Sequence, residues 1–190
     1  MGNVFYFDWE MELLYSLQSI HNPVLDKVML FITTLGNAGM VWIAITILMF
    51  ILCKDKRCAW TSTGALLLSV LIINLILKNL VARARPCWID TDVMLLLKNP
   101  KDYSFPSGHA SASFAVAVSI LQFAEYRKQG IAAIVLAAMI AFSRMYFFVH
   151  FPTDIIAGVV LGILEAVVAG LLVKKLEERK NSAKKRQKRK

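Results

Sequence analysis

The chain has few cysteines and few acidic residues, and both shortages limit what it can be. Its three cysteines are an odd number, and no Cys/His spacing in the 190 residues is typical of a zinc site. Thirteen Asp and Glu stand against 22 Lys and Arg, so the net charge is +9. The first twenty residues lack the basic n-region of a cleavable signal peptide and carry three acids instead: Asp8, Glu10 and Glu12.

Apolar residues, in contrast, are in excess, at 57% of the chain. A soluble domain of this length has too much surface to bury so many apolar side chains. A bilayer core of about 30 Å takes roughly 20 apolar residues to cross. We therefore expect an all-α, polytopic membrane bundle with five spans, at residues 40–53, 62–80, 110–124, 131–149 and 155–173.

The N-terminal part is more polar. Residues 5–20 place apolar side chains three or four positions apart with acids between them. This spacing predicts an amphipathic helix, within residues 1–22, that lies in the membrane interface. Residues 24–35 are apolar but are interrupted by Asp26 and Lys27, so they predict either a half-inserted helix or part of a bent span. The sequence therefore allows either five or six spans, and it allows the N-terminus to lie on either side of the membrane.

Basic residues predict the topology. Ten Lys or Arg lie within residues 174–190, where an anchor on anionic lipid headgroups is favoured over nucleic-acid binding because the run directly follows a span. The loops after residues 53 and 124 are basic as well, so both loops and the tail are expected in the cytoplasm. The long loop 81–105 also carries basic residues, Arg83 among them, which weakens the rule. The chain is then one transmembrane domain of the cell membrane, residues 1–173, with a basic cytoplasmic tail at 174–190.

Three short motifs stand at the ends of the expected spans. They are Lys78-x6-Arg85-Pro86, Pro106-Ser107-Gly108-His109 and Ser143-Arg144-x5-His150-x3-Asp154. In the predicted topology the first motif closes one span, the second opens the next, and the third joins the last two. All three then fall on the extracytoplasmic face, so we expect them to form one site there.

The cations of these motifs suit a phosphate group. A Lys or Arg at a span end is costly and usually functional, although a snorkelling anchor explains any single one equally well. Phosphoryl transfer places charge on three equatorial oxygens, which the planar fork of arginine and the point charge of lysine stabilise. A helix that begins near Ser107 would add free N–H groups and a positive dipole. The predicted phosphate-binding residues are Lys78, Arg85, Ser107, Gly108 and Arg144.

Two histidines and one carboxylate supply the reacting groups. Asp154 follows His150 by four positions, so on a helix it can hold the ring and leave the other ring nitrogen as a nucleophile. Pro152 favours a helix that starts near this point. His109 is then the acid for the leaving oxygen and afterwards the base that activates water. We expect neither a metal nor another cofactor, because no ligand pattern connects the remaining acids of the long loop, Asp90, Asp92 and Asp102.

At these residues the chain resembles the type 2 phosphatidic acid phosphatase superfamily. The three-part signature of that family is matched in order, from Lys78 to Asp154, without a departure. The resemblance implies a helical membrane fold, commonly of six helices, and a metal-independent phosphatase that acts on lipid phosphates or diphosphates. It also implies a phosphohistidine intermediate on His150, oriented by Asp154, with His109 as the acid.

Several branches of this family share the signature, so the lipid stays open among undecaprenyl diphosphate, phosphatidate and phosphatidylglycerophosphate. A phosphotransferase with the same intermediate is one alternative. A non-catalytic lipid-binding or transport protein is another, although binding alone needs neither histidine. In the long loop, Trp88 and the apolar residues 94–97 either line a path for the lipid or, as we favour, pack at the interface.

Overall fold

The computed structural model describes residues 2–187, and that part of the chain is all-helical, as the sequence predicts. Its one extended pairing is an isolated backbone bridge between Asn3 and Arg83. The elements are α1 (Asp8–Ser19), α2 (Pro23–Leu35), η1 (Asn37–Gly39), α3 (Met40–Leu52), α4 (Arg57–Ser69), η2 (Val70–Leu77), α5 (Lys78–Val81), α6 (Pro86–Ile89), α7 (Gly108–Leu121), η3 (Ala124–Tyr126), α8 (Arg127–Tyr146) and α9 (Pro152–Gln187).

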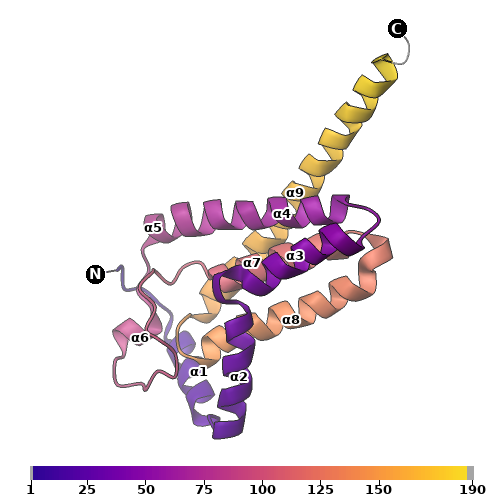
Figure 1. Ribbon diagram of the computed structural model, residues 1–190. Helices are drawn as coiled ribbons and strands as arrows, with labels where there is room; N and C mark the ends of the chain where they lie inside the picture. The colour runs from indigo at the N-terminus through magenta and orange to yellow at the C-terminus, as the bar shows by residue number, and fades with distance from the viewer. Residues whose placement is uncertain (1, 188–190) are drawn as a thin grey trace.

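Helix α7 forms the centre of the bundle. Helices α4, α8 and α9 pack around it, and α3 lies along another side (Figure 1). Small side chains allow this close packing, since Ala110, Ser111, Ala115 and Ala117 are all fully buried. The 14 residues of α7 rise only about 21 Å, which is less than the bilayer core. The span expected over residues 110–124 is therefore a short, enclosed helix.

Two glycines bring α9 directly against α7. A Cβ atom on Gly162 would lie 2.4 Å from the carbonyl oxygen of Ser111, and one on Gly158 would lie 2.6 Å from the carbonyl oxygen of Ser107. Both contacts involve backbone, which cannot rotate out of the way. The packing therefore holds the start of α9 beside the start of α7, and residues of the second and third motifs lie at these two helix ends.

Three helical segments in residues 2–187 are long and apolar enough to cross a bilayer: Arg57–Val81, Ala124–Tyr146 and Pro152–Gln187. The first combines α4, the π-helical stretch η2 and α5. Helix α2 and the segment Asn37–Leu52 form a fourth candidate together, bent by 48° at the break between them. The membrane-type helical architecture is thus as expected, whereas the predicted count of five or six spans is not confirmed.

Helices α1 and α2 lie at the bottom of the view in Figure 1, crosswise to the bundle. The amphipathic helix expected over residues 5–20 corresponds to α1. Glu10, Met11 and Leu14 are buried, while Trp9 and Leu13 are 48% and 41% exposed. The exposed apolar face suits the membrane interface, and the buried carboxylate requires a partner inside the protein.

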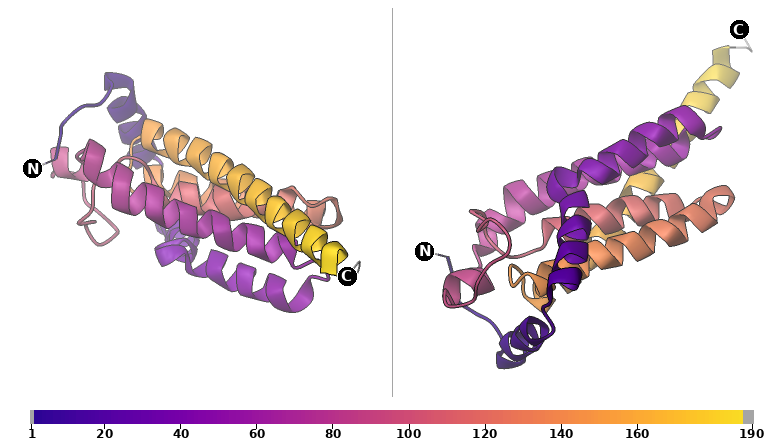
Figure 2. Two further views of the ribbon diagram at one scale, coloured as in Figure 1. Left: turned by 90° about the horizontal axis from the view of Figure 1, so that it is seen from above. Right: turned by 60° about the horizontal axis from the view of Figure 1, so that its bottom comes forward.

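The two ends of the bundle differ in charge. Helices α4 and α8 begin at the basic loops and run toward the three motifs, and α9 returns in the opposite direction (Figures 1 and 2). The 36 residues of α9 rise about 54 Å, so its C-terminal part projects beyond the other helices. The tail predicted at 174–190 continues this helix through Gln187, and its last three residues lie outside the described part of the chain.

The contact of Gly162 with α7 leads to a first prediction. We expect Gly162→Ala to lower the free energy of unfolding by about 1–3 kcal/mol, because the backbone of Ser111 leaves no space for a methyl group. Thermal unfolding in detergent measures this loss. Gly170→Ala is the matched control, since its Cβ would meet only the flexible side chain of Gln122. Equal losses in the two variants would contradict the proposed packing constraint.

Candidate active site

The three motifs meet at one end of the bundle. Lys78 opens α5 after the long α4–η2 segment, and Arg144 lies in the last turn of α8. Helix α7 begins at Gly108, and Ser107 caps it by accepting a hydrogen bond from the backbone N–H of Ala110 at 3.4 Å. The backbone N–H of Ser107 also donates to the carbonyl oxygen of Asp154 at 3.0 Å, which joins the second motif to the third.

His150 lies in the turn between α8 and α9 and not on a helix. Phe148, in the same turn, has a φ of 58°, and the backbone N–H of Val149 donates to the carbonyl oxygen of Arg144. This turn carries His150 toward the first turn of α9, where Nδ1 lies 3.5 Å from Oδ2 of Asp154. The four-residue spacing thus predicts a true contact, but the contact arises from a turn and not from a shared helical face.

The surroundings of His150 select one tautomer. The Nη1 atom of Arg85 lies 3.1 Å from Nε2 of His150, and a guanidinium group can only donate. Nε2 is therefore the unprotonated nitrogen, and the ring proton lies on Nδ1, which faces Asp154. Burial, together with the charges of Arg85 and Arg144, lowers the pKa of His150 well below its ordinary value. The ring is neutral at pH 7, with a lone pair on Nε2.

Three further contacts fix the carboxylate of Asp154. Arg83 donates from Nη1 to Oδ1 at 2.7 Å, and the Ser104 hydroxyl donates to Oδ2 at 2.5 Å. The backbone N–H of Phe151 also donates to Oδ2, at 2.9 Å. Since every member of this group is buried, the carboxylate has a defined position and holds the imidazole in one orientation.

Arg83 also connects the site to the N-terminal helix. Its Nη2 donates to Oε2 of Glu10 at 2.8 Å, and Glu10 in turn accepts from the hydroxyl of Thr153 at 2.6 Å. Sequence reasoning treats Arg83 as a basic loop residue and Glu10 as part of a polar face, and it does not consider Ser104. The only local signal for Arg83 is its position, two residues before Arg85.

Lys78 and Arg85 share an acidic partner. Both cations are buried, and both pair with the carboxylate of Asp102, Arg85 at 2.9 Å from Oδ1. Burial alone would raise the pKa of Asp102, but the charges of Arg85 and Lys78 outweigh it and lower that pKa below its ordinary value, so the acid is ionised at pH 7. The sequence places Asp102 in a loop without a ligand pattern, whereas in the fold it balances one of the site's charges.

Arg144 and His109 approach the site from the side of α2 and η1. Arg144 donates from Nη1 to the hydroxyl of Thr33 at 2.6 Å, and its buried Nε–H has no partner among residues 2–187. Nε2 of His109 lies 3.3 Å from Oδ1 of Asn37. With Lys78 and Arg85, Arg144 makes three cations against the single charge of Asp102. This excess of positive charge suits the oxygens of an anionic phosphate group.

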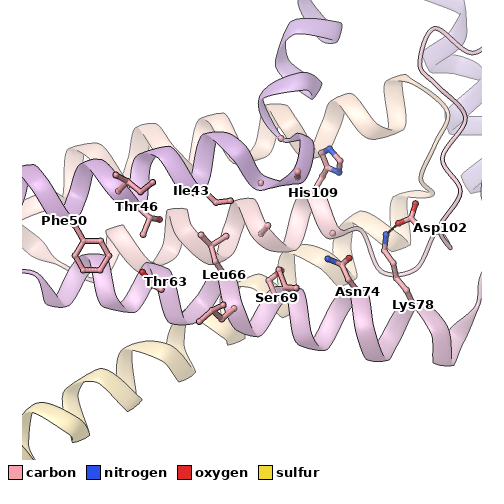
Figure 3. Close-up of a pocket in the computed structure, with 18 residues that line it drawn as sticks. Ile43, Thr46, Phe50, Thr63, Leu66, Ser69, Asn74, Lys78, Asp102 and His109 are labelled. Atoms are coloured by element: carbon pink, nitrogen blue, oxygen red, sulfur yellow. Dashed lines mark hydrogen bonds and ion pairs between the residues drawn. The ribbon is translucent and has the colours of Figure 1, made fainter.

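An apolar cavity of about 660 Å³ leads away from these charged groups. Lys78, Asp102 and His109 lie at one end, and Ile43, Leu66 and Phe50 lie along it between α3, α4 and α7 (Figure 3). Ile47 and Leu67, which also line it, are 54% and 60% exposed, so the cavity is open sideways to the surroundings of the bundle.

The apolar part of the long loop, residues 88–97, lies elsewhere. Trp88, Leu95 and Leu97 pack against the aromatic cluster under the third motif, and Met94 is exposed. None of these residues lines the apolar cavity. Packing is therefore the interpretation that agrees with the structure, in preference to a lining for a lipid path.

Comparison with known proteins identifies the family of this chain. A family model described as the PAP2 superfamily matches residues 59–178. An undecaprenyl-diphosphatase of Sulfolobus acidocaldarius is 32% identical over 138 residues, which cover 73% of this chain and 66% of that protein. A phosphatidylglycerophosphatase B of Bacillus subtilis is 32% identical over 161 residues, which cover 76% of this chain and 73% of that protein. The crystal structure of Aquifex aeolicus LpxE matches with a TM-score of 0.75 at 28% identity, over 86% of this chain and 95% of that one.

The fold and the comparisons together define a helical membrane protein of a phosphatase type. The chain belongs to the PAP2 superfamily, which is the family that its three motifs resemble. This membership and the names of its relatives support a phosphatase, which is a hydrolase.

The buried position of Arg83 leads to a second prediction. We expect Arg83→Met to lower the free energy of unfolding by about 3–5 kcal/mol, because it leaves Glu10 and Asp154 buried without a cation. Thermal unfolding in detergent measures the loss. Arg127→Met removes an exposed arginine and serves as the control. Matching melting temperatures for the two variants would show that the ion group does not hold the fold.

Proposed function

We propose that this protein is a metal-independent phosphatase that removes phosphate from a membrane lipid, with a polyprenyl diphosphate as the preferred substrate class. The observation that carries the proposal is the geometry of His150, whose Nε2 lone pair faces Arg85 while its Nδ1 side faces Asp154. A buried, neutral and oriented imidazole beside a cluster of cations is the arrangement that nucleophilic attack on a phosphate requires.

The reaction proceeds in two steps. The substrate's phosphate oxygens first take over the N–H of Arg85 that donates to Nε2 of His150. The freed Nε2 then attacks phosphorus, the bond from phosphorus to the leaving oxygen breaks, and His109, in its protonated form, gives a proton to that oxygen. Water then attacks the phosphohistidine while His109 takes a proton from it, which releases inorganic phosphate and restores His150. Asp154 holds the ring in both steps and stabilises the positive charge that develops on it.

The cations hold the phosphate oxygens. Lys78, Arg85 and Arg144 neutralise the charge on the equatorial oxygens, and the Nε–H of Arg144, which has no partner among residues 2–187, can donate to one of them. The N-terminus of α7, at Ser107 and Gly108, adds a positive dipole. Because protein cations supply this stabilisation, the chemistry needs no metal ion.

The apolar cavity supports a lipid substrate. The cavity follows the helical segment from Thr63 to Lys78, and this length suits an extended hydrocarbon chain. A single groove suits one chain better than two, which favours a prenyl lipid over a diacyl lipid. The relative named undecaprenyl-diphosphatase is consistent with this choice.

The distribution of charge supports an extracytoplasmic site and a cytoplasmic C-terminus. The basic loops at Lys54, Arg57 and Arg127 lie at the ends of α3, α4 and α8 that are remote from the motifs, and the basic end of α9 lies there as well. The positive-inside rule assigns that end to the cytoplasm, where the tail meets anionic headgroups.

The nucleophile leads to a third prediction. We expect His150→Ala to lower phosphate release from undecaprenyl diphosphate by at least about 10³-fold, while wild-type turnover persists in EDTA. A colorimetric assay of released phosphate measures both, with phosphatidate and phosphatidylglycerophosphate run in parallel. Acid-labile, base-stable labelling of the wild-type protein by radioactive substrate tests the intermediate.

His21→Ala is the matched histidine control, since His21 lies outside the cavity and contacts Tyr146. Full activity in His150→Ala would exclude this nucleophile, and loss of wild-type activity in EDTA would exclude the metal-free route. Faster turnover of a diacyl substrate would reject the prenyl assignment alone.

The apolar cavity leads to a fourth prediction. We expect Ile47→Trp to lower kcat/KM for a long-chain prenyl diphosphate by about tenfold, because the indole fills space that the chain needs. Hydrolysis of p-nitrophenyl phosphate, which has no chain, should stay unchanged. Leu48→Trp, also on α3 but outside the cavity lining, is the control. Equal effects on both substrates would show that the cavity does not hold the lipid chain.

A further inference from the structure

A second cavity, of about 830 Å³, lies between α4 and α9 at the end of the bundle remote from the three motifs. Figure 2 shows these two helices side by side as they approach that end. Thr63 and Leu67 of α4 line both cavities, so the second lies on the α9 side of α4 and the first on its α3 side. The reaction proposed above does not use the second cavity.

The lining changes from apolar to cationic along α9. Ala169, Leu172 and Leu176 line its inner part, and Lys180 and Lys184 line its outer part. All five residues lie three or four positions apart, so they form one stripe on the helix. A hydrocarbon region followed by cations is the order in which a phospholipid presents its acyl chain and its phosphate.

Some of the basic side chains at the rim of this cavity have partners within the protein, and others do not. Arg57 pairs with Asp55 at 2.6 Å and with Glu177 at 3.2 Å, which links α4 to α9. Lys56 donates from Nζ to the carbonyl oxygens at the end of α3. Within residues 2–187, Lys180 and Lys184 have neither a carboxylate nor a hydrogen-bond partner, so they are available to an external anion.

We propose that this groove binds one phospholipid with an anionic headgroup, from the leaflet opposite the active site. One acyl chain lies along the apolar part of the groove while the other stays in the bilayer, and Lys180 and Lys184 hold the phosphate. Trp60, which lines the groove and is 58% exposed, has the position of a side chain at the membrane–water interface. A second copy of the chain is a poorer occupant, because a two-fold contact would bring two cationic rims together.

Fluorescence of Trp60 tests this site. The protein is placed in phosphatidylcholine nanodiscs that contain a fixed fraction of brominated lipid, either phosphatidylglycerol or phosphatidylcholine, and the Trp60 signal is the difference from Trp60→Phe. We expect brominated phosphatidylglycerol to quench this signal several-fold more efficiently. The ratio of quenching by brominated phosphatidylglycerol to quenching by brominated phosphatidylcholine should fall to about one in Lys180→Gln/Lys184→Gln. It should persist in Lys175→Gln/Lys185→Gln, which removes the same charge outside the groove. Phosphatase activity should be unchanged in both double variants.

Three results would overturn the proposal. Equal quenching by the two brominated lipids would show only unselective contact with the bilayer. Loss of the preference in both double variants would assign it to the charge of the tail and not to the groove. Weak quenching by either lipid, together with a dimer by native mass spectrometry, would show that a second copy covers the groove.

Discussion

The structure depends on one buried ion group, in which Arg83 lies between Glu10 and Asp154. The side chain of Arg83 is 2% exposed and both carboxylates are fully buried. Removing three charges from water is costly, and only their mutual contacts offset that cost, so the group forms as a whole or not at all. It joins α1, the segment after α5 and the start of α9. The N-terminal helix, which carries none of the three motifs, is thereby coupled to the orientation of His150.

Aromatic packing keeps this group out of water. The guanidinium of Arg83 lies 4.1 Å from the ring centre of Phe151 and 5.0 Å from that of Phe5. Tyr146, Phe147 and Phe148 bury the turn that carries His150. Burial of this kind disfavours a charged imidazole, so His150 stays neutral. It also strengthens electrostatic contacts, so the interaction between Asp154 and the His150 ring is stronger than it would be in water.

The parts of the site that could be predicted from sequence are those with a local signal. Helix starts at Gly108 and Pro152 follow from capping and proline chemistry, and hydropathy with charge places the motifs at one end. Glu10, Arg83 and Asp102 lack such a signal, because their burial or pairing exists only once distant segments meet. The buried face of α1 lacks such a signal for a related reason: in a membrane, lipid accepts apolar side chains as readily as a core does, so apolar spacing alone does not identify the buried face.

Asp102 shows why a site for an anion contains an acid. Positive charge attracts the phosphate of substrate and product alike, and uniform binding of this kind does not accelerate the chemical step. The carboxylate of Asp102 lowers the net positive charge of the site by one, while it holds Lys78 and Arg85 in place before a phosphate arrives. Its side chain is 55% exposed and belongs to the long loop, so it can yield its contacts to phosphate oxygens without leaving a buried charge unpaired. A carboxylate on one of the packed helices could not move away from the cations in this way. A position on the loop therefore suits the acid that balances their charge.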